Sequence, residues 1–458
     1  MFVSDGSNGS MEIIKKLSCE SYEASTIDPE LYTKYNVKRG LRNADNTGVL
    51  VGLTNVGDVR GYIMEENEKI PIEGKLIYRD IDIYDFVNGF TSEHRFGFEE
   101  CIYLLLTGNL PTESELNELV NVLDEYRRLP DGFAENMILK APSPDIMNKL
   151  QRCVLASYSY DSNPEEQSIE NTFRQCLRLI AQLPTMTAYA YQARAHYYED
   201  KSLYIHNPQK GLSTAENLLQ MIRPDTKYSR LEAEILDLNL VIHAEHGGGN
   251  NSTFAIHVVT STGTDTYSAM SAGIGSLKGP KHGGANLKVM DMMDDIKNNV
   301  NDWSNDKEIY DYLVKILNKE AYDGSGLIYG IGHAVYTKSD PRAVLLKKKA
   351  EELAYEKGHE KEFELYRKVE ELSLQAFEDV KKNGKDMCAN VDFYSGFVYS
   401  MLNIPKELYT PIFAISRIVG WSAHRIEEMV AGKKIIRPAY KNVGAKKYAG
   451  KYIPIKKR

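Results

Sequence analysis

The sequence is poor in cysteine and has no long apolar run. Its 458 residues include five cysteines, an odd number, and no two of them have C-x-x-C spacing. This pattern argues against a disulfide framework and against a cysteine zinc site. No apolar stretch reaches the roughly 20 residues of a membrane-spanning helix, and residues 1–16 lack the apolar centre of a signal peptide. We therefore expect a cytoplasmic protein without a membrane partner.

The sequence also has no excess of positive charge. A formal net charge of -8 argues against non-specific nucleic-acid binding by the whole molecule. The P-loop, the G-x-G-x-x-G fingerprint and the G-x-S-x-G elbow are absent, so nucleoside-triphosphate binding, Rossmann and serine-hydrolase functions lack support. A hydrophobic content of 42% is typical of a folded globular protein, and the length favours two domains.

Helical periodicity dominates most of the chain. Phe98–Thr107 is an apolar stretch that glycine follows, and Thr112 with Glu115 has the pattern of a capping box. Residues 358–382 carry apolar side chains on one helical stripe, beside densely charged faces. Residues 47–79 instead alternate short apolar runs with glycine and charged residues, which predicts short strands. The expected fold class is therefore mainly α, with a few short N-terminal β-strands.

The two ends of the chain differ from the rest. Residues 1–10 are rich in Ser, Gly and Asn, which predicts disorder. Residues 433–458 carry ten Lys or Arg and no Asp or Glu, with tyrosine and isoleucine interleaved. The interleaved apolar side chains favour a tail that wraps a partner subunit over one that binds nucleic acid. A solvated charged tail or an anion site is the alternative.

Three histidines stand beside glycines. His246 and His282 each precede at least two glycines, and His333 follows a Gly-Ile-Gly sequence. Glycine lets a ligand approach the backbone closely, and histidine exchanges protons near neutral pH. Arg342 could form two parallel bonds to a carboxylate, and Asp392 could act as a base. These side chains are candidates for acid–base chemistry. From the sequence alone, purely structural roles stay open: His333 could be a surface residue of a loop, and His282 could cap or start a helix.

His243 and His246 are also a candidate pair of metal ligands. They are three residues apart, but a third ligand of suitable spacing is absent and the motif is not H-E-x-x-H. We therefore expect no metal there.

Six segments of the chain resemble the citrate synthase family, in that family's order and approximate spacing. They are His243–Ser252, Gly279–Asn286, Gly330–Arg342, Asn390–Gly396, Ser416–Gly420 and Ile436–Pro438. The resemblance covers about residues 45–440 and includes an early region at 78–111. It implies a two-domain helical fold with four parts. These are an N-terminal segment at 1–45, a large domain at 46–286, a small domain at 287–395, and a return to the large domain with a tail at 396–458.

The resemblance implies an acyltransferase, citrate synthase, that condenses acetyl-CoA with oxaloacetate and hydrolyses citryl-CoA without metal or other cofactor. By that resemblance Asp392 takes a proton from the acetyl methyl group, His282 donates a hydrogen bond to the thioester oxygen, and His333 binds the ketone of oxaloacetate. The oxaloacetate carboxylates would be held by His246, Arg342, Arg417 and, from the other subunit of a homodimer, Arg437. The CoA moiety would lie against Gly330, Ile331, Gly332, Ala334 and Asn390.

Other functions stay open from the sequence. One is 2-methylcitrate synthase, which uses propionyl-CoA, since one methylene contributes only ~1–3 kcal/mol to discrimination. Another is a non-catalytic helical scaffold that binds CoA or a partner, against which the presence of Asp392, His282 and His333 argues. A third is a metal-dependent hydrolase. Thr337 stands where relatives often carry a basic residue, so the contacts of the CoA phosphates are not implied.

Overall fold

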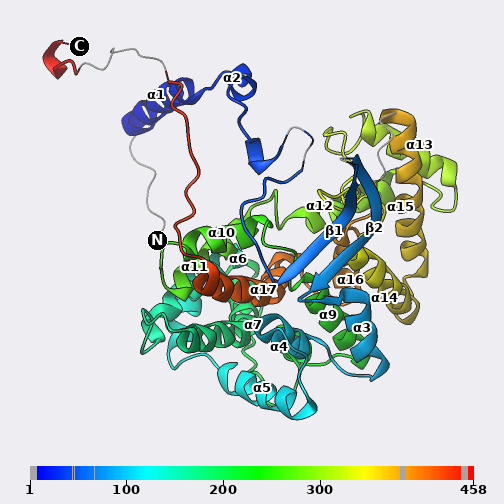
Figure 1. Ribbon diagram of the computed structural model, residues 1–458. Helices are drawn as coiled ribbons and strands as arrows, with labels where there is room; N and C mark the ends of the chain where they lie inside the picture. Colours follow the sequence, from blue (N-terminus) through cyan, green and yellow to red (C-terminus); the bar gives the residue numbers. More distant parts are fainter. Residues whose placement is uncertain are drawn as a thin grey trace. The chain divides into compact units, whose positions relative to one another are not determined.

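The computed structural model describes residues 8–43, 45, 47–66, 68–381, 387–444 and 452–457. Within these ranges the chain is mainly α-helical, with seventeen α-helices and one three-stranded sheet (Figure 1). This confirms the predicted fold class. The chain forms two compact units, Met1–Gly52 with Arg437–Arg458, and Leu53–Ile436. Of the described helices, none is long and apolar enough to cross a membrane.

The first unit contains α1 (Asn8–Ser25) and α2 (Pro29–Lys34). The helix α1 begins at Asn8, and residues 1–7 of the segment predicted to be disordered lie outside the described residues. Several large apolar side chains of α1 are exposed, including Ile13, Ile14 and Leu17. The C-terminal part of this unit likewise exposes Tyr440.

The second unit contains the remaining helices. They are α3 (Ile83–Ser92), α4 (Phe98–Thr107), α5 (Glu113–Tyr126), α6 (Ile146–Ser157), α7 (Ile169–Glu199), α8 (Thr214–Ile222), α9 (Arg230–His243), α10 (Asn251–Thr260), α11 (Thr266–Lys278), α12 (Ala285–Asn299), α13 (Asp306–Leu317), α14 (Pro341–Lys357), α15 (Glu360–Lys381), α16 (Val391–Met401) and α17 (Tyr409–Ala431). Local sequence explains many of their ends. The predicted capping box of Thr112 with Glu115 is present at the start of α5, and Gly108 ends α4 in the left-handed conformation.

The sheet is a single antiparallel ladder of β1 (Gly57–Glu65), β2 (Glu68–Tyr78) and β3 (Ile81–Asp82), in that order. Within the region 47–79, where the sequence predicts short strands, β1 and β2 together cover most of the part from residue 57 onward. Two glycines let this hairpin approach the loop before α14. A Cβ on Gly61 would collide with the carbonyl oxygen of Val335, and one on Gly74 with that of Ser339. The hairpin thus supports one wall of the candidate site.

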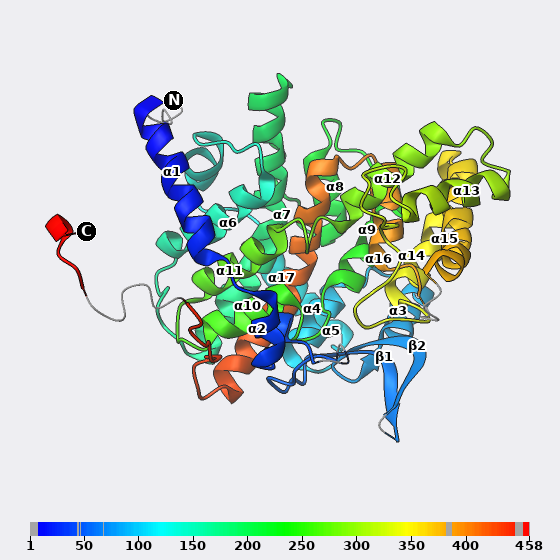
Figure 2. The same cartoon turned by 90° about the horizontal axis from the view of Figure 1, so that it is seen from above.

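The helix α17 runs through the core of the second unit, and nearly all of its residues from Tyr409 to Arg425 are buried. It packs against α7, α9, α10 and α11 (Figure 2). A helix that is buried all round places any polar side chain it carries inside the protein. A second part of the core lies between α12, α14, α15 and α16, where the Tyr366 and Phe397 rings stack with centroids 4.6 Å apart.

Candidate active site

The predicted site residues of the second unit lie where several loops and helix ends meet. His246 follows α9, His282 precedes α12, and His333 lies in the loop before α14. Asp392 is in the first turn of α16, and Arg417 is in the middle of α17. Arg437 belongs to the other unit, so its predicted place beside these residues stays a prediction.

Backbone pairing joins the loop at 330–332 to the segment before α16. The N–H of Gly332 donates to Cys388 O at 2.8 Å, and the N–H of Asn390 donates to Gly330 O at 2.9 Å. The Asn390 side chain caps α16 by accepting from Asp392 N at 3.0 Å, and its amide donates to Gly332 O at 2.9 Å. This pairing places His333 and Asp392, 59 residues apart in the chain, on adjoining segments. The residues predicted to contact CoA therefore lie on two segments that hydrogen bonds hold together: Gly330, Ile331, Gly332 and Ala334 on one, and Asn390 on the other.

Gly330 and Gly332 have positive φ values of 82° and 97°. A Cβ on Gly330 would come within 2.8 Å of the Phe393 and Val289 side chains. Both the backbone conformation and the packing therefore require glycine at 330.

His333 has a defined tautomer. Its Nδ1 accepts hydrogen bonds from Val335 N and Tyr336 N, both at 3.1 Å. Burial and the nearby Arg342 lower its pKa to about 4, so the ring is neutral near pH 7. Because Nδ1 is an acceptor, the ring hydrogen is on Nε2. His333 is thus a neutral hydrogen-bond donor toward a ligand oxygen.

Asp340 and Arg342 lie at the start of α14. Asp340 caps the helix, and its carboxylate accepts from Arg342 Nε at 3.0 Å and from Arg342 Nη2 at 2.7 Å. Burial opposes the charge of Arg342, but the carboxylate outweighs this effect and raises its pKa above the ordinary value. The pair keeps a fully charged guanidinium buried in the site.

Two of the predicted site residues, Arg417 and His246, have buried side-chain nitrogens without a hydrogen-bond partner among the described residues. Arg417 donates from Nε to His243 O at 2.6 Å, whereas its Nη1 and Nη2 are buried and unpartnered. Nε2 of His246 is also buried and unpartnered. Burial lowers the pKa of Arg417 to about 10, which still leaves it charged at neutral pH. An unpaired buried guanidinium is costly, so this arrangement is suited to an anion.

The rings of the site are close together. The centroids of His246 and His333 are 5.2 Å apart, and Tyr336 stacks on His333 at 4.7 Å. The Arg417 guanidinium lies 4.7 Å from the centroid of the Phe413 ring, which His282 approaches edge-on at 6.3 Å. Sequence reasoning did not single out Tyr336 or Phe413, since aromatic side chains carry no sequence signal for a site.

His282 is held through a serine. Its Nε2 lies 3.0 Å from Ser252 Oγ, which also accepts from Trp421 Nε1 at 3.2 Å. Burial and Arg417 lower the pKa of His282 to about 4, so this ring is also neutral and has one N–H to donate. Ser252 was missed as a site residue, although it lies in the segment that includes His246.

Asp392 is the candidate base. Burial raises its pKa to about 6, an effect that Arg342 opposes and Asp340 reinforces. A carboxylate with this pKa is ionised at pH 7 and accepts a proton more readily than an ordinary aspartate. His243, in contrast, is a core residue: its Nδ1 lies 2.8 Å from Asn239 O, and its ring packs edge-on against Phe413.

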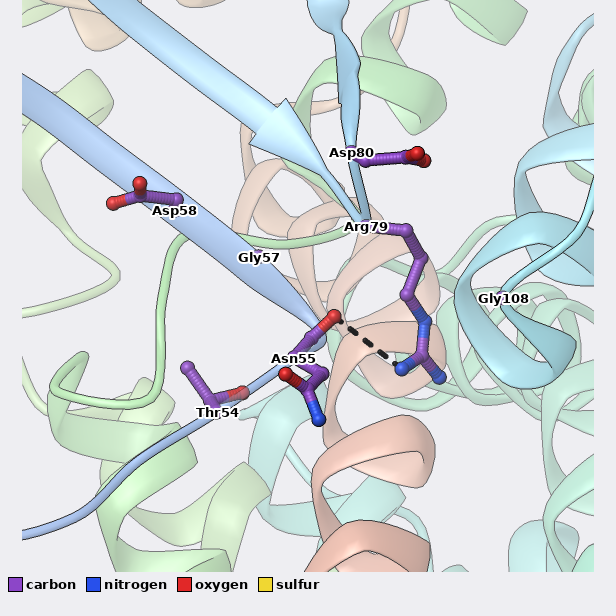
Figure 3. Close-up of a pocket in the computed structure, with 7 residues that line it drawn as sticks. All are labelled: Thr54, Asn55, Gly57, Asp58, Arg79, Asp80 and Gly108. Carbon is purple, nitrogen blue, oxygen red and sulfur yellow. Dashed lines mark hydrogen bonds between the residues drawn. The ribbon is translucent and has the colours of Figure 1, made fainter.

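A surface pocket of about 650 Å³ lies elsewhere in the second unit (Figure 3). It is lined by Thr54, Asn55, Gly57, Asp58, Arg79, Asp80 and Gly108. The Arg79 guanidinium is hydrogen-bonded to the protein's own backbone, since Nε donates to Leu105 O at 3.0 Å and Nη1 to Asn55 O at 3.4 Å. None of the predicted site residues lines this pocket.

Comparison with known proteins gives consistent matches. A family model described as citrate synthase, C-terminal domain, matches residues 45–439. A citrate synthase of Haloferax volcanii is 34% identical over 90% of this chain and 96% of its own length. A 2-methylcitrate synthase of Shewanella oneidensis is 32% identical over 84% of this chain and 92% of its own.

Solved structures match over similar lengths. A citrate synthase from Pyrobaculum aerophilum aligns with a TM-score of 0.74 and 30% identity, covering 90% of this chain and 95% of its own. A citrate synthase from Thermoplasma acidophilum, in a ternary complex with carboxymethyl coenzyme A and oxaloacetate, aligns with a TM-score of 0.74 and 25% identity. That alignment covers 92% of this chain and 99% of its own.

Proposed function

This chain belongs to the citrate synthase family of transferases, and on that premise we propose how its residues condense acetyl-CoA with oxaloacetate and hydrolyse citryl-CoA to citrate and CoA. The main supporting observation is that the Nη atoms of Arg417 and Nε2 of His246 are buried and have no hydrogen-bond partner among the described residues. Oxaloacetate is a dianion, and its carboxylates would supply the acceptors that these donors need.

Oxaloacetate would be held by His246, Arg342 and Arg417. Each charge-assisted hydrogen bond of this kind contributes about 1.5–3 kcal/mol. His333 would donate from Nε2 to the ketone oxygen, which polarises the carbonyl carbon toward attack. The tautomer of His333, set by two backbone N–H groups, supports this role.

Asp392 would remove a proton from the methyl group of acetyl-CoA. A free carboxylate is too weak a base for this step, so the developing enolate oxygen needs a donor. The neutral His282 would supply one hydrogen bond there, worth roughly 3 kcal/mol of barrier lowering. The enolate carbon then attacks the ketone carbon of oxaloacetate, and water hydrolyses the resulting thioester.

The CoA moiety would lie on the surface formed by Gly330, Ile331, Gly332, Ala334 and Asn390. These residues belong to the proposed small domain at 287–395, which would close on the large domain at 46–286 and its return within 396–458 to exclude water. Residues 1–45 and the tail to 458 would lie outside this pair. The reaction as proposed requires no metal and no further cofactor, because arginine and histidine side chains stabilise each developing charge.

The working molecule would be a cytoplasmic homodimer in which Arg437 of the partner subunit completes the oxaloacetate site. Exposed apolar side chains on α1 and the exposed Tyr440 support a subunit interface formed by the first unit. All five cysteines are free thiols, and four are buried, which supports a reducing compartment.

A thiol-release assay with oxaloacetate tests the proposal. We expect a higher kcat/KM with acetyl-CoA than with propionyl-CoA. The match to a 2-methylcitrate synthase makes that activity the second candidate, and a preference for propionyl-CoA would establish it. Release with neither thioester, from protein that binds CoA, would instead favour the non-catalytic scaffold.

A further inference from the structure

Two histidines and a glutamate converge beneath the His246 loop. His257 is on α10, and His424 and Glu427 are on α17, which packs beside α10 (Figure 2). Nε2 of His257 lies 3.2 Å from Nδ1 of His424, and Oε2 of Glu427 lies 3.6 Å from the same Nδ1. All three atoms lie within 4.8 Å of one another. Ligand atoms bound to one tetrahedral zinc ion are separated by similar distances, since each bond is about 2.0–2.2 Å long.

In each histidine, the ring nitrogen that points away from the other histidine is hydrogen-bonded to a carboxylate. Nε2 of His424 lies 3.0 Å from Glu245 Oε1, and Nδ1 of His257 lies 2.8 Å from Glu428 Oε2. Metal-binding histidines almost always donate their second N–H to a carboxylate or carbonyl, which directs the other nitrogen's lone pair at the metal. Both rings therefore have the outer partners typical of zinc ligands.

The third proposed ligand is Glu427. Oε1 of Glu427 accepts from the backbone N–H of Asn55 at 2.6 Å, which fixes the carboxylate. Oε2 is buried and has no hydrogen-bond partner among the described residues. This oxygen forms an ion pair with Nδ1 of His424 at 3.6 Å, a contact that a bound metal ion would replace.

Gly248 lies beside the two nitrogens that face each other. A Cβ built on Gly248 would lie 3.5 Å from Nε2 of His257 and 3.8 Å from Nδ1 of His424. A glycine at 248 leaves that side free of a side chain. The side chains of His257 and Glu427 are 12% and 14% exposed, so the cluster lies near the protein surface.

We propose that His257, His424 and Glu427 form a site for a divalent transition metal of the Zn²⁺ class, with Gly248 beside it. Two nitrogen donors select this class over Mg²⁺ and Ca²⁺, which take oxygen ligands. In the metal-free protein, His257 Nδ1 and His424 Nε2 each carry a hydrogen that is donated to a carboxylate, and a third hydrogen lies between the two rings. A bound metal ion would replace this third hydrogen, so one proton leaves for each ion bound.

This site differs from the proposed catalytic site, and it does not depend on the proposed function. None of its three ligands is among the residues that we place on oxaloacetate or CoA. Glu245, the outer partner of His424, precedes His246 in the chain and also accepts the backbone N–H of Gly247. An ion in this site would therefore bind behind the loop that presents His246.

The test is Zn²⁺ binding to the full chain, measured by competition with a chromophoric chelator at pH 7.5. The wild type should bind one Zn²⁺ per chain. His257→Gln removes a ligand, and Glu427→Gln weakens one. Each substitution should lower the Zn²⁺ affinity at least about tenfold, because loss of a group that only hydrogen-bonds to a metal ligand already lowers metal affinity about tenfold or more. Mg²⁺ at the same concentration should not compete.

The matched control is His359→Gln, because His359 is also paired with a carboxylate, Glu362, at 3.2 Å but lies on the surface near α15. This variant should bind Zn²⁺ as the wild type does. Failure of the wild type to bind Zn²⁺ in the micromolar range, or equal affinity in His257→Gln, would overturn the proposal. A crystal of the wild type soaked in Zn²⁺ needs no variant: anomalous density between His257 and His424 supports the site, and density elsewhere alone rejects it.

Discussion

The carboxylate of Asp340 holds the guanidinium of Arg342 through two hydrogen bonds, of 3.0 and 2.7 Å, and also accepts from Val391 N at 3.2 Å. One buried acid thus aligns the proposed substrate arginine and links the N-terminal ends of α14 and α16. The orientation of Arg342 therefore depends on the segment that carries Asp392.

Arg342→Lys should raise the KM for oxaloacetate by about 10- to 150-fold, because lysine keeps the charge but loses the forked geometry and one charge-assisted bond of roughly 1.5–3 kcal/mol. Steady-state kinetics with varied oxaloacetate measures this change. An unchanged KM would mean that Arg342 only shapes the start of α14. As a control, Lys338→Ala removes a nearby exposed charge and should leave this KM within about threefold.

Asp392→Asn should reduce turnover to below about a tenth of wild type while oxaloacetate binding persists. The amide keeps the shape of the side chain but cannot accept the methyl proton. Thiol release gives the turnover, and isothermal titration with oxaloacetate gives the binding. Turnover that survives above that level would remove Asp392 from the role of base.

The turnover number should fall as the pH decreases through about 6. Burial raises the pKa of Asp392 to about 6, so the carboxylate is charged above this pH and protonated below it. Only the charged form accepts a proton, so kcat should lose about tenfold per pH unit on the acid side. A pH profile of kcat between pH 5 and 8 checks this, and a flat profile down to pH 5 would contradict it.

Arg417→Met should abolish the stabilisation of the protein by oxaloacetate and lower the melting temperature of the free protein only slightly. The substitution removes a buried guanidinium whose Nη atoms have no partner among the described residues, and it loses the Nε bond to His243 O, which costs about 1–3 kcal/mol of folding free energy. At 100 times Kd, oxaloacetate should stabilise the wild type by about 2.7 kcal/mol. Thermal melts with and without oxaloacetate measure both effects. An equal shift in wild type and variant would show that Arg417 does not hold the substrate.

Arg437→Ala and Asp392→Asn should complement each other in mixed dimers. If Arg437 acts across the subunit interface, one site of a mixed dimer collects both defects and the other collects neither. Random reassembly makes about half of the dimers mixed, each with one working site of two, so up to about a quarter of wild-type activity should return. Mixed dimers that form, as native mass spectrometry can verify, but stay inactive would show that Arg437 does not act in trans.

Local sequence accounts for much of the helical framework. Capping at Thr112 depends on residues three apart, and the end of α4 depends on one glycine, so both can be predicted from short windows. The same signals occur at Ser229 with Glu232, which form a capping box at the start of α9. Asp340 before Pro341 likewise has the pattern of a helix start, which indicates a cap but not a partner for Arg342.

The helical class, many helix ends, and the set of acidic, basic and histidine side chains available for chemistry follow from the order of residues along the chain. The protonation and hydrogen bonding of those side chains depend on how the chain packs. Val335 and Tyr336 assign the hydrogen of His333, and burial on α17 leaves the Nη atoms of Arg417 without a partner. These properties depend on burial and on contacts between distant segments, such as the pairing of Ile331 with Ala389. A short sequence window contains neither, because both arise from packing of the whole chain.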